Sequence, residues 1–230
     1  MTILPLHPAD NASSPEALRA FLQQCHAAAV RDRHAKLVSI SLAVGALDPL
    51  AVLESIFEPD EPHFYAERPS LGTAIAGAEL AAWHEAQGAG RFAAVKAWME
   101  DMLSHAIAVG DVAAPFGGPH FFAAFAFHDE VEGGEAFPAA SIFVPSWQVA
   151  LAGSTTTAVA NLLVTPESDL AALAVRVWRA HQKFQHLGFQ EPPGPAPITS
   201  PQFKVREAGE YRAAVAQALA RIARKEFGKI

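Results

Sequence analysis

Short runs of apolar and β-branched residues, broken by proline, glycine and serine, recur along the chain and constrain its fold most strongly. Such runs are typical of β-strands, whose side chains pack on a pleated surface. Gly77 lies inside one run and predicts a bulge or a close backbone contact there. We expect strands at residues 36–44, 62–69, 72–83, 119–127, 140–145, 147–153 and 155–164.

Helical signals separate these runs. Asn11–Glu16 supplies a capping serine with an early proline and glutamate, and predicts a helix to about Val30 with Leu18, Phe21 and Leu22 facing inward. Apolar residues at intervals of three and four predict an amphipathic helix over 92–109. The other expected helices are 48–57, opened by Asp48-Pro49, 168–187, opened by Ser168-Asp169, and one from 209 to a cap at Gly228. The sequence therefore predicts an α+β fold, with a mainly antiparallel sheet and flanking helices.

A proline-rich stretch at 188–206 is the best candidate for a linker. It divides the chain into an expected α+β unit at 1–187 and a final helical segment at 207–230. After the Gly228 cap, Lys229 and Ile230 begin a new element and the sequence stops. We therefore expect the chain to be cut short within a longer protein.

Composition excludes several classes of function. The chain has 230 residues, 51% of them hydrophobic, which is enough for one sizeable core, and a net charge of −7, which disfavours nucleic acids and anionic membranes. No apolar stretch reaches the ~18 residues that a membrane span needs, and the N-terminus does not resemble a secretory signal, so we expect a cytoplasmic protein. The single cysteine, Cys25, excludes an internal disulfide and is expected to be a small buried hydrophobe.

Neighbouring ionisable side chains are the next candidates for chemistry. They are His120, His128 with Asp129 and Glu130, His181, His186, the pair Glu130 and Glu132, and the pair Asp60 and Glu61. His181 and His186 are five positions apart and do not share a helix face. The carboxylates fall in turn-like sequence, where solvated charge is the usual explanation. We therefore expect no metal site.

Two further patterns also favour structural interpretations. Ser154–Thr157 lacks the glycines and the lysine of a phosphate-binding loop, and predicts the start of a strand. The four tryptophans, Trp83, Trp98, Trp147 and Trp178, fall in expected elements and should lie in the core or at an interface. Local chemistry alone does not name a function.

Three segments in order resemble the isochorismate synthases, within the wider group of chorismate-using enzymes. They are Pro62–Glu79, Gly118–Glu130 followed by Phe137–Ala150, and Glu210–Ile230. The second departs from the family pattern, since Ala123 and Ala124 stand where glycines are common and His128 precedes the aspartate. The third resembles the helix that opens the catalytic half of the family, and only Lys229 and Ile230 remain of the strand that follows it.

The resemblance implies the N-terminal half of an anthranilate-synthase-component-I-like fold, in which two large antiparallel sheets pack together with helices outside. It implies that Lys229 is the general base, which activates water to attack C2 of chorismate while a glutamate protonates the departing C4 hydroxyl. The glutamate that acts as the general acid, the Mg²⁺ ligands and the residues that bind chorismate would follow residue 230. We therefore expect this chain to be inactive alone and to hold neither Mg²⁺ nor chorismate, and its parent to serve menaquinone or siderophore synthesis.

A half-fold also implies an exposed apolar sheet face, so the chain would either self-associate through this face or hold a partly independent subdomain. Two alternatives stay open. One is a sibling enzyme, an anthranilate, aminodeoxychorismate or salicylate synthase, because Leu53-Glu54-Ser55 resembles a motif near the amino-acid inhibitor site of anthranilate synthases. The other is a stand-alone binding module without catalysis.

Overall fold

The computed structural model describes residues 1–3, 15–45, 47–56, 60–132, 135, 137–186 and 210–226. The chain divides into two compact units, Met1–Gln190 and Glu191–Ile230. The proline-rich stretch at 188–206 lies outside the described residues. No described helix is long and apolar enough to cross a membrane.

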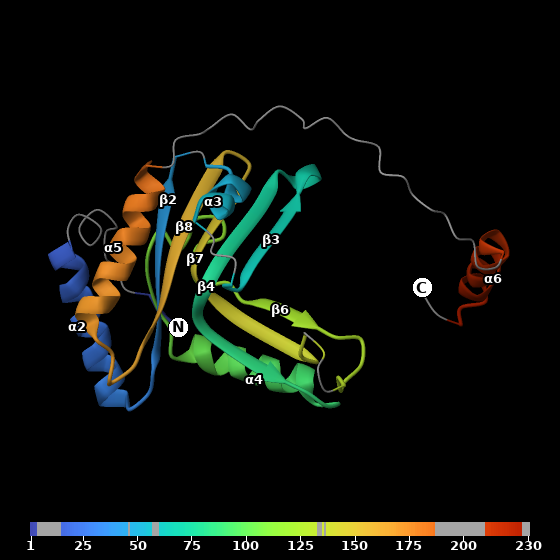
Figure 1. Cartoon of the computed structure of the whole chain (residues 1–230), viewed down its shortest axis with the longest axis horizontal. Helices are drawn as coiled ribbons and strands as arrows, with labels where there is room; N and C mark the ends of the chain where they lie inside the picture. Colours follow the sequence, from blue (N-terminus) through green and yellow to red (C-terminus); the bar gives the residue numbers. More distant parts are fainter. Residues whose placement is uncertain are drawn as a thin grey trace. The chain divides into compact units, whose positions relative to one another are not determined.

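The first unit is built on one eight-stranded sheet (Figure 1). The strand order is β1-β5-β2-β8-β7-β4-β3, and β6 pairs with β7 beside this path. Pairing is parallel only where β5 meets β1 and β2, so the expectation of a mainly antiparallel sheet is confirmed. The strands are β1 Thr2–Ile3, β2 Lys36–Val44, β3 His63–Arg68, β4 Thr73–Ala86, β5 Ile107–Gly110, β6 Phe122–Phe125, β7 Ala140–Ala152 and β8 Thr155–Val164.

Four α-helices flank this sheet, and local capping signals place two of their starts. The side chain of Asp48 accepts a hydrogen bond from the backbone N–H of Leu50, and that of Asp169 accepts one from Ala171. The helices are α2 Pro15–Asp32, α3 Pro49–Ile56, α4 Arg91–Ser104 and α5 Leu170–His186, with a 3₁₀ turn, η1, at Pro69–Leu71.

The core lies mainly between one sheet face and helices α2, α3 and α5. Leu18, Phe21 and Leu22 of α2 are buried, as their spacing predicts, and pack with Val38 and Leu162 from the sheet. The short helix α3 covers the same face further along, over Trp147, Val149 and Ala158. Burial of this apolar surface is the main stabilising term of such a fold.

Helix α4 covers a separate part of the sheet, beside the far ends of β4 and β7 (Figure 1). Val95 packs there on Ala140 and Ile142 of β7. On the strand, Phe143 alternates with these two residues and therefore points to the opposite face. Trp83 of β4 is paired with Phe143 and is 58% exposed, so this opposite face keeps an uncovered aromatic side chain.

The helix expected over 92–109 is too long by five residues. It ends at Ser104, and Ile107–Gly110 forms strand β5. Val38 of β2 pairs with Ile107, and Ile40 pairs with Val109, in parallel. This pairing buries Ile107 and Val109 in the core. The stabilisation from that burial decides the conformation, although the two residues also fit the spacing of a helix.

Residues 140–145 and 147–153 form one strand rather than two, and β7 runs straight through Pro145. The register between β4 and β7 shifts there, between Leu80 and Ala82, and the pairing with β8 has already ended at Trp147. A proline without an N–H is tolerated at such a point because it interrupts no ladder bond. The carbonyl of Pro145 instead accepts a hydrogen bond from the Asn161 side chain.

Close backbone packing at Gly77 is confirmed. A Cβ atom there would lie 3.0 Å from the Phe122 ring and 3.0 Å from Pro145 Cγ. The bulge itself lies further along β4, at the register shift between Leu80 and Ala82, just after Glu79, which has a φ of 59°. The strand expected at 119–127 is shorter than its apolar sequence and spans only Phe122–Phe125.

The second unit contains α6, Tyr211–Ala223. The helix ends earlier than expected, because Lys225 turns into the left-handed region with a φ of 59° and donates its N–H to the Ile222 carbonyl. Gly228, the expected cap, lies outside the described residues. The apolar stripe of Tyr211, Val215 and Leu219 is exposed on this unit.

Candidate functional site

Lys229, the expected general base, lies outside the described residues, as do the side chains of His181 and His186. Other described residues form the candidate sites. The residues that the sequence singled out for chemistry lie mostly where a structural role places them, in solvent or in the core.

The acidic candidates lie in solvent. His128, Asp129, Glu130 and Glu132 are exposed on the connection after β6. The His128 ring stands edge-on to Phe127. Among the described side chains, these residues do not belong to any group of three that could hold a metal ion.

Cys25 is buried in the α2 core. Burial raises the pKa of its thiol to about 12, so it stays protonated and unreactive at neutral pH. Thr156 and Thr157 are buried at the start of β8, as expected for a strand. Leu53 is buried against the sheet, and the Ser55 hydroxyl donates to the Ala51 carbonyl within α3.

A buried polar cluster lies on the sheet face opposite α2. Val38 packs towards α2, so its neighbours Ser39 and Ser41 point the other way. Gln148, also fully buried, accepts a hydrogen bond from the His120 backbone N–H at 3.2 Å and donates to the Gly118 carbonyl at 3.2 Å. The Ser41 hydroxyl accepts from the Gly118 N–H at 2.9 Å. These bonds hold the segment 111–121, which connects β5 to β6, against the sheet.

The same segment depends on close backbone packing. Gly110 has a φ of 84°, and a Cβ atom there would overlap the carbonyl oxygen of Ser41 at 2.0 Å. At Gly117 a Cβ atom would lie 2.6 Å from the Val112 carbonyl oxygen. The Asp111 side chain adds a bond by accepting from the Ala43 N–H at 2.8 Å. Backbone and side chains together fix this segment.

His120 is the ionisable member of the polar cluster. Its Nδ1 lies 2.8 Å from the Gln148 amide nitrogen and 3.2 Å from the Gly118 carbonyl. Burial lowers its pKa below the ordinary 6.5, and the hydrogen bond that a protonated ring would donate to the Gly118 carbonyl opposes that shift only in part. We assign Nδ1 as the acceptor for Gln148, because that contact is the shorter one. His120 is then neutral and carries its proton on Nε2.

We expect the lowered pKa of His120 to appear in the pH dependence of the unfolding free energy. A histidine with a lowered folded pKa contributes stability that is complete above its unfolded pKa. This contribution should be lost as the pH falls from about 6.5 through the folded value. His120→Gln should flatten that part of the profile of urea-unfolding free energy against pH, whereas the exposed control His128→Gln should leave it unchanged. Parallel profiles for His120→Gln and the unsubstituted chain would contradict the assignment.

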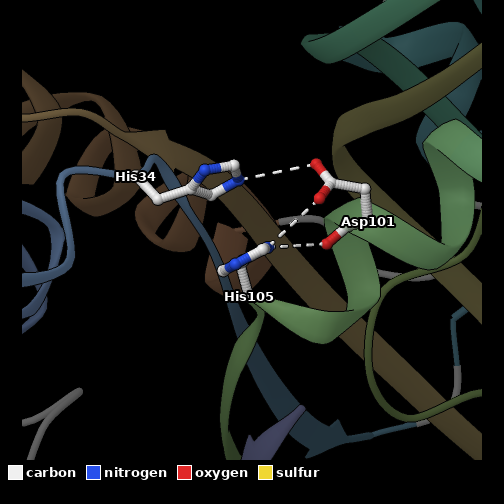
Figure 2. Close-up of side chains that lie close together, drawn as sticks. All are labelled: His34, Asp101 and His105. Carbon is white, nitrogen blue, oxygen red and sulfur yellow. Dashed lines mark hydrogen bonds and ion pairs between the residues drawn. The ribbon is translucent and has the colours of Figure 1, made fainter.

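A second group, formed by His34, Asp101 and His105, lies where two turns meet (Figure 2). The parallel register of Val38 with Ile107 brings the starts of β2 and β5 side by side. His34 precedes β2, and His105 precedes β5. Asp101 lies one helical turn before His105 on α4, so its side chain shares the same face.

The contacts within this group are short. His34 Nε2 lies 3.5 Å from Asp101 Oδ2, and His105 Nδ1 lies 3.5 Å from Asp101 Oδ1. The two imidazole centroids are 3.7 Å apart. His105 Nδ1 also lies 3.0 Å from the main-chain carbonyl of Asp101 and 2.9 Å from the Ser104 hydroxyl. Two basic nitrogens and one carboxylate therefore converge on one point.

The spacing of these residues in the sequence indicates the group only weakly, and none of the candidates named from the sequence includes it. The spacing of four between Asp101 and His105 fits one helix face, but those two residues lie in a segment that we expected to be helical throughout. His34 joins them only through the pairing of β2 with β5. The expectation that the chain holds no metal stays a prediction, and this group is the described arrangement that could test it.

Comparison with known proteins gives three similarities. Residues 20–230 match the family profile described as "Chorismate binding enzyme". The chain is 26% identical over 199 residues to the Salicylate biosynthesis isochorismate synthase of Pseudomonas aeruginosa, covering 84% of this chain and 40% of that protein. The solved structure of MenF, the menaquinone-specific isochorismate synthase of Escherichia coli, aligns at 13% identity and a TM-score of 0.43, over 75% of this chain and 36% of that one.

Proposed function

Because the chain belongs to the family of chorismate-binding enzymes, we propose that it forms the N-terminal portion of an isochorismate synthase, which converts chorismate to isochorismate. The observation that carries this proposal is the family match over residues 20–230. The curated relative supports isochorismate as the product within the family. The chain spans 40% of the length of that relative, which supports a portion of the enzyme rather than the whole.

We assign Lys229 the role of general base on the same ground. A lysine removes a proton from water near neutral pH only where burial or neighbouring positive charge lowers its pKa. Such surroundings would come from sequence that follows residue 230. The proposal therefore predicts that residues 1–230 alone do not convert chorismate.

The proposed enzyme uses Mg²⁺, but the described residues do not fit this ion. Mg²⁺ prefers an octahedron of oxygen ligands. The group of His34, Asp101 and His105 supplies two imidazoles and one carboxylate. The described residues therefore support no step through Mg²⁺, and we propose that its ligands lie beyond residue 230.

The experiment begins with the coding sequence after codon 230. The longer protein should convert chorismate with added MgCl₂, and chromatography should identify isochorismate as the product, with no product from residues 1–230. Anthranilate, aminodeoxychorismate or salicylate as the direct product would replace the proposal with a sibling enzyme. A native stop after codon 230 would overturn it in favour of a binding module.

We also propose that the isolated chain self-associates through its uncovered aromatic side chains. Trp83 is 58% exposed and Phe127 is 94% exposed, and the half-exposed rings of Phe92 and Phe125 contact each other in a tilted pair. Burying such groups against a second copy removes apolar area from water.

Sedimentation velocity at increasing concentration should show association of the isolated chain, and Trp83→Glu should weaken it by about tenfold or more. Leu71→Glu is the matched control, because Leu71 is equally exposed but lies in η1, at the opposite end of β4. A chain that stays monomeric at all concentrations would refute self-association.

A further inference from the structure

We propose that His34, Asp101 and His105 bind a transition-metal ion of the Zn²⁺ class, which clips the turn before β2 to the end of α4. One ligand atom from each residue lies within 4.8 Å of the other two (Figure 2). The proposal concerns a different ion and a different place from the proposed isochorismate chemistry, and it does not depend on that function.

The distances suit such an ion. Bonds from Zn²⁺ to imidazole nitrogen or carboxylate oxygen are about 2.0 to 2.2 Å, so two ligands on one tetrahedral ion stand roughly 3.3 Å apart. The two histidines each lie 3.5 Å from Asp101, His34 from Oδ2 and His105 from Oδ1. Binding therefore requires either that both carboxylate oxygens face the ion or that the carboxylate turns to present one oxygen, together with a closer approach between the histidine nitrogens.

The backbone holds the ligands in place before an ion arrives. Helix α2 ends with Arg33 in the left-handed region, at a φ of 50°, and the N–H of His34 donates to the Ala29 carbonyl at 3.2 Å. This is the hydrogen-bond pattern of a Schellman cap, which fixes the chain at His34. Asp101 and His105 are fixed by the last turn of α4 and by the start of β5.

An ion can replace the present contacts of His105 without leaving a carbonyl unsatisfied. Nδ1 of His105 now faces the main-chain oxygen of Asp101, and metal binding through this nitrogen would remove that hydrogen bond. The oxygen still accepts from the Ser104 hydroxyl at 2.7 Å and from the His105 backbone N–H at 3.3 Å. Replacing the His105 hydrogen bond with a bond to the ion therefore costs little free energy.

Ligand chemistry and exposure define the class of ion. Imidazole nitrogen favours Zn²⁺, Ni²⁺ or Cu²⁺ over Mg²⁺ and Ca²⁺. The side chains of His34, Asp101 and His105 are 40%, 52% and 33% exposed, so an ion can enter from solvent. Three protein ligands leave a tetrahedral position for water or for an outside ligand.

The test uses residues 1–230 after removal of any histidine tag and of bound metal with a chelator. Calorimetric titration with ZnCl₂ should show a single equivalent bound, and the same addition should raise the melting temperature. His34→Gln, Asp101→Asn and His105→Gln should each weaken binding by at least about tenfold and remove most of the thermal shift. An excess of MgCl₂ should not displace the ion.

The chain has ten histidines, so adventitious binding needs its own control. His128→Gln removes an exposed histidine that stands next to Asp129 and Glu130, and it should leave affinity and stoichiometry unchanged. Metal-free melting temperatures of the variants check that each one folds. The proposal is overturned if the three substitutions leave Zn²⁺ binding unchanged, or if His128→Gln weakens binding as much as they do.

Discussion

Lys229→Ala should lower the turnover of the proposed full-length isochorismate synthase by about 10² to 10⁴, while the KM for chorismate changes little. General-base catalysis contributes a factor of this size, which corresponds to roughly 3 to 5 kcal/mol of activation free energy. Lys229→Arg should not restore activity, because a guanidinium stays protonated at any pH the enzyme tolerates. Steady-state kinetics with chorismate and MgCl₂ measures both effects.

Lys225→Ala is the matched control. Lys225 lies four positions earlier, is exposed, and occupies the left-handed residue that ends α6. Its replacement should leave turnover within about twofold, because surface charges of this kind contribute little. If Lys229→Ala retains most of the activity while the enzyme makes isochorismate, the family assignment stands and the assignment of the base fails.

Gly110→Ala should cost roughly 3 to 5 kcal/mol of unfolding free energy, among the largest losses expected from a single methyl group in this chain. Two penalties combine there. The added Cβ would overlap the Ser41 carbonyl oxygen, and a residue with a side chain disfavours a φ of 84°. Ser41 pairs with Gly110 in the parallel ladder, so the backbone cannot move away without losing that pairing. Urea unfolding monitored by circular dichroism measures the loss.

Substitutions at two other glycines measure the steric penalty and the backbone penalty separately. Gly153 has a φ of 60° and open space around its Cβ position, so Gly153→Ala should cost only about 1 kcal/mol. Gly117 has the steric contact, against Val112 and Asp111, without the left-handed backbone, so Gly117→Ala should fall between the two. Equal losses for Gly110→Ala and Gly153→Ala would show that the backbone at Ser41 yields easily.

Features encoded by neighbouring residues were predictable from the sequence. Leu18, Phe21 and Leu22 repeat at helical spacing and lie in the core, and Asp48 and Asp169 begin the helices that they were expected to cap. The family resemblance was also predictable, because its motifs are short contiguous segments, and the match over residues 20–230 confirms it.

Features set by distant partners were not predictable. Ile107–Gly110 follows the helical pattern of the preceding turns, and only its pairing with distant strands, β1 and β2, makes this segment a strand. A proline usually ends a strand. At Pro145 the register of β4 shifts and the pairing with β8 has ended, so the missing N–H interrupts no hydrogen bond of the sheet. Strand propensity depends on such neighbours more than on the residue itself.

The same distinction applies to the candidate sites. The Lys229 hypothesis comes from a contiguous motif and stays a prediction. His34 meets Asp101 and His105 only because two strands pair in parallel, and Gln148 meets His120 only through the fold of the segment between β5 and β6. No spacing rule within one helix or strand would bring either group together.

The position of β2 has a consequence for how the chain reaches its native state. Strands β7 and β8 are joined by a tight turn and can form their hydrogen-bonded ladder early in folding. Strand β2 must then find β8 across more than a hundred intervening residues, as in the pairing of Lys36 with Val164. Closing so long a loop is entropically costly, and topologies rich in such contacts fold slowly. During synthesis, β2 leaves the ribosome well before β8 has been made. The backbone groups of β2 that pair with β8 therefore stay unpaired, beside apolar side chains, until β8 emerges.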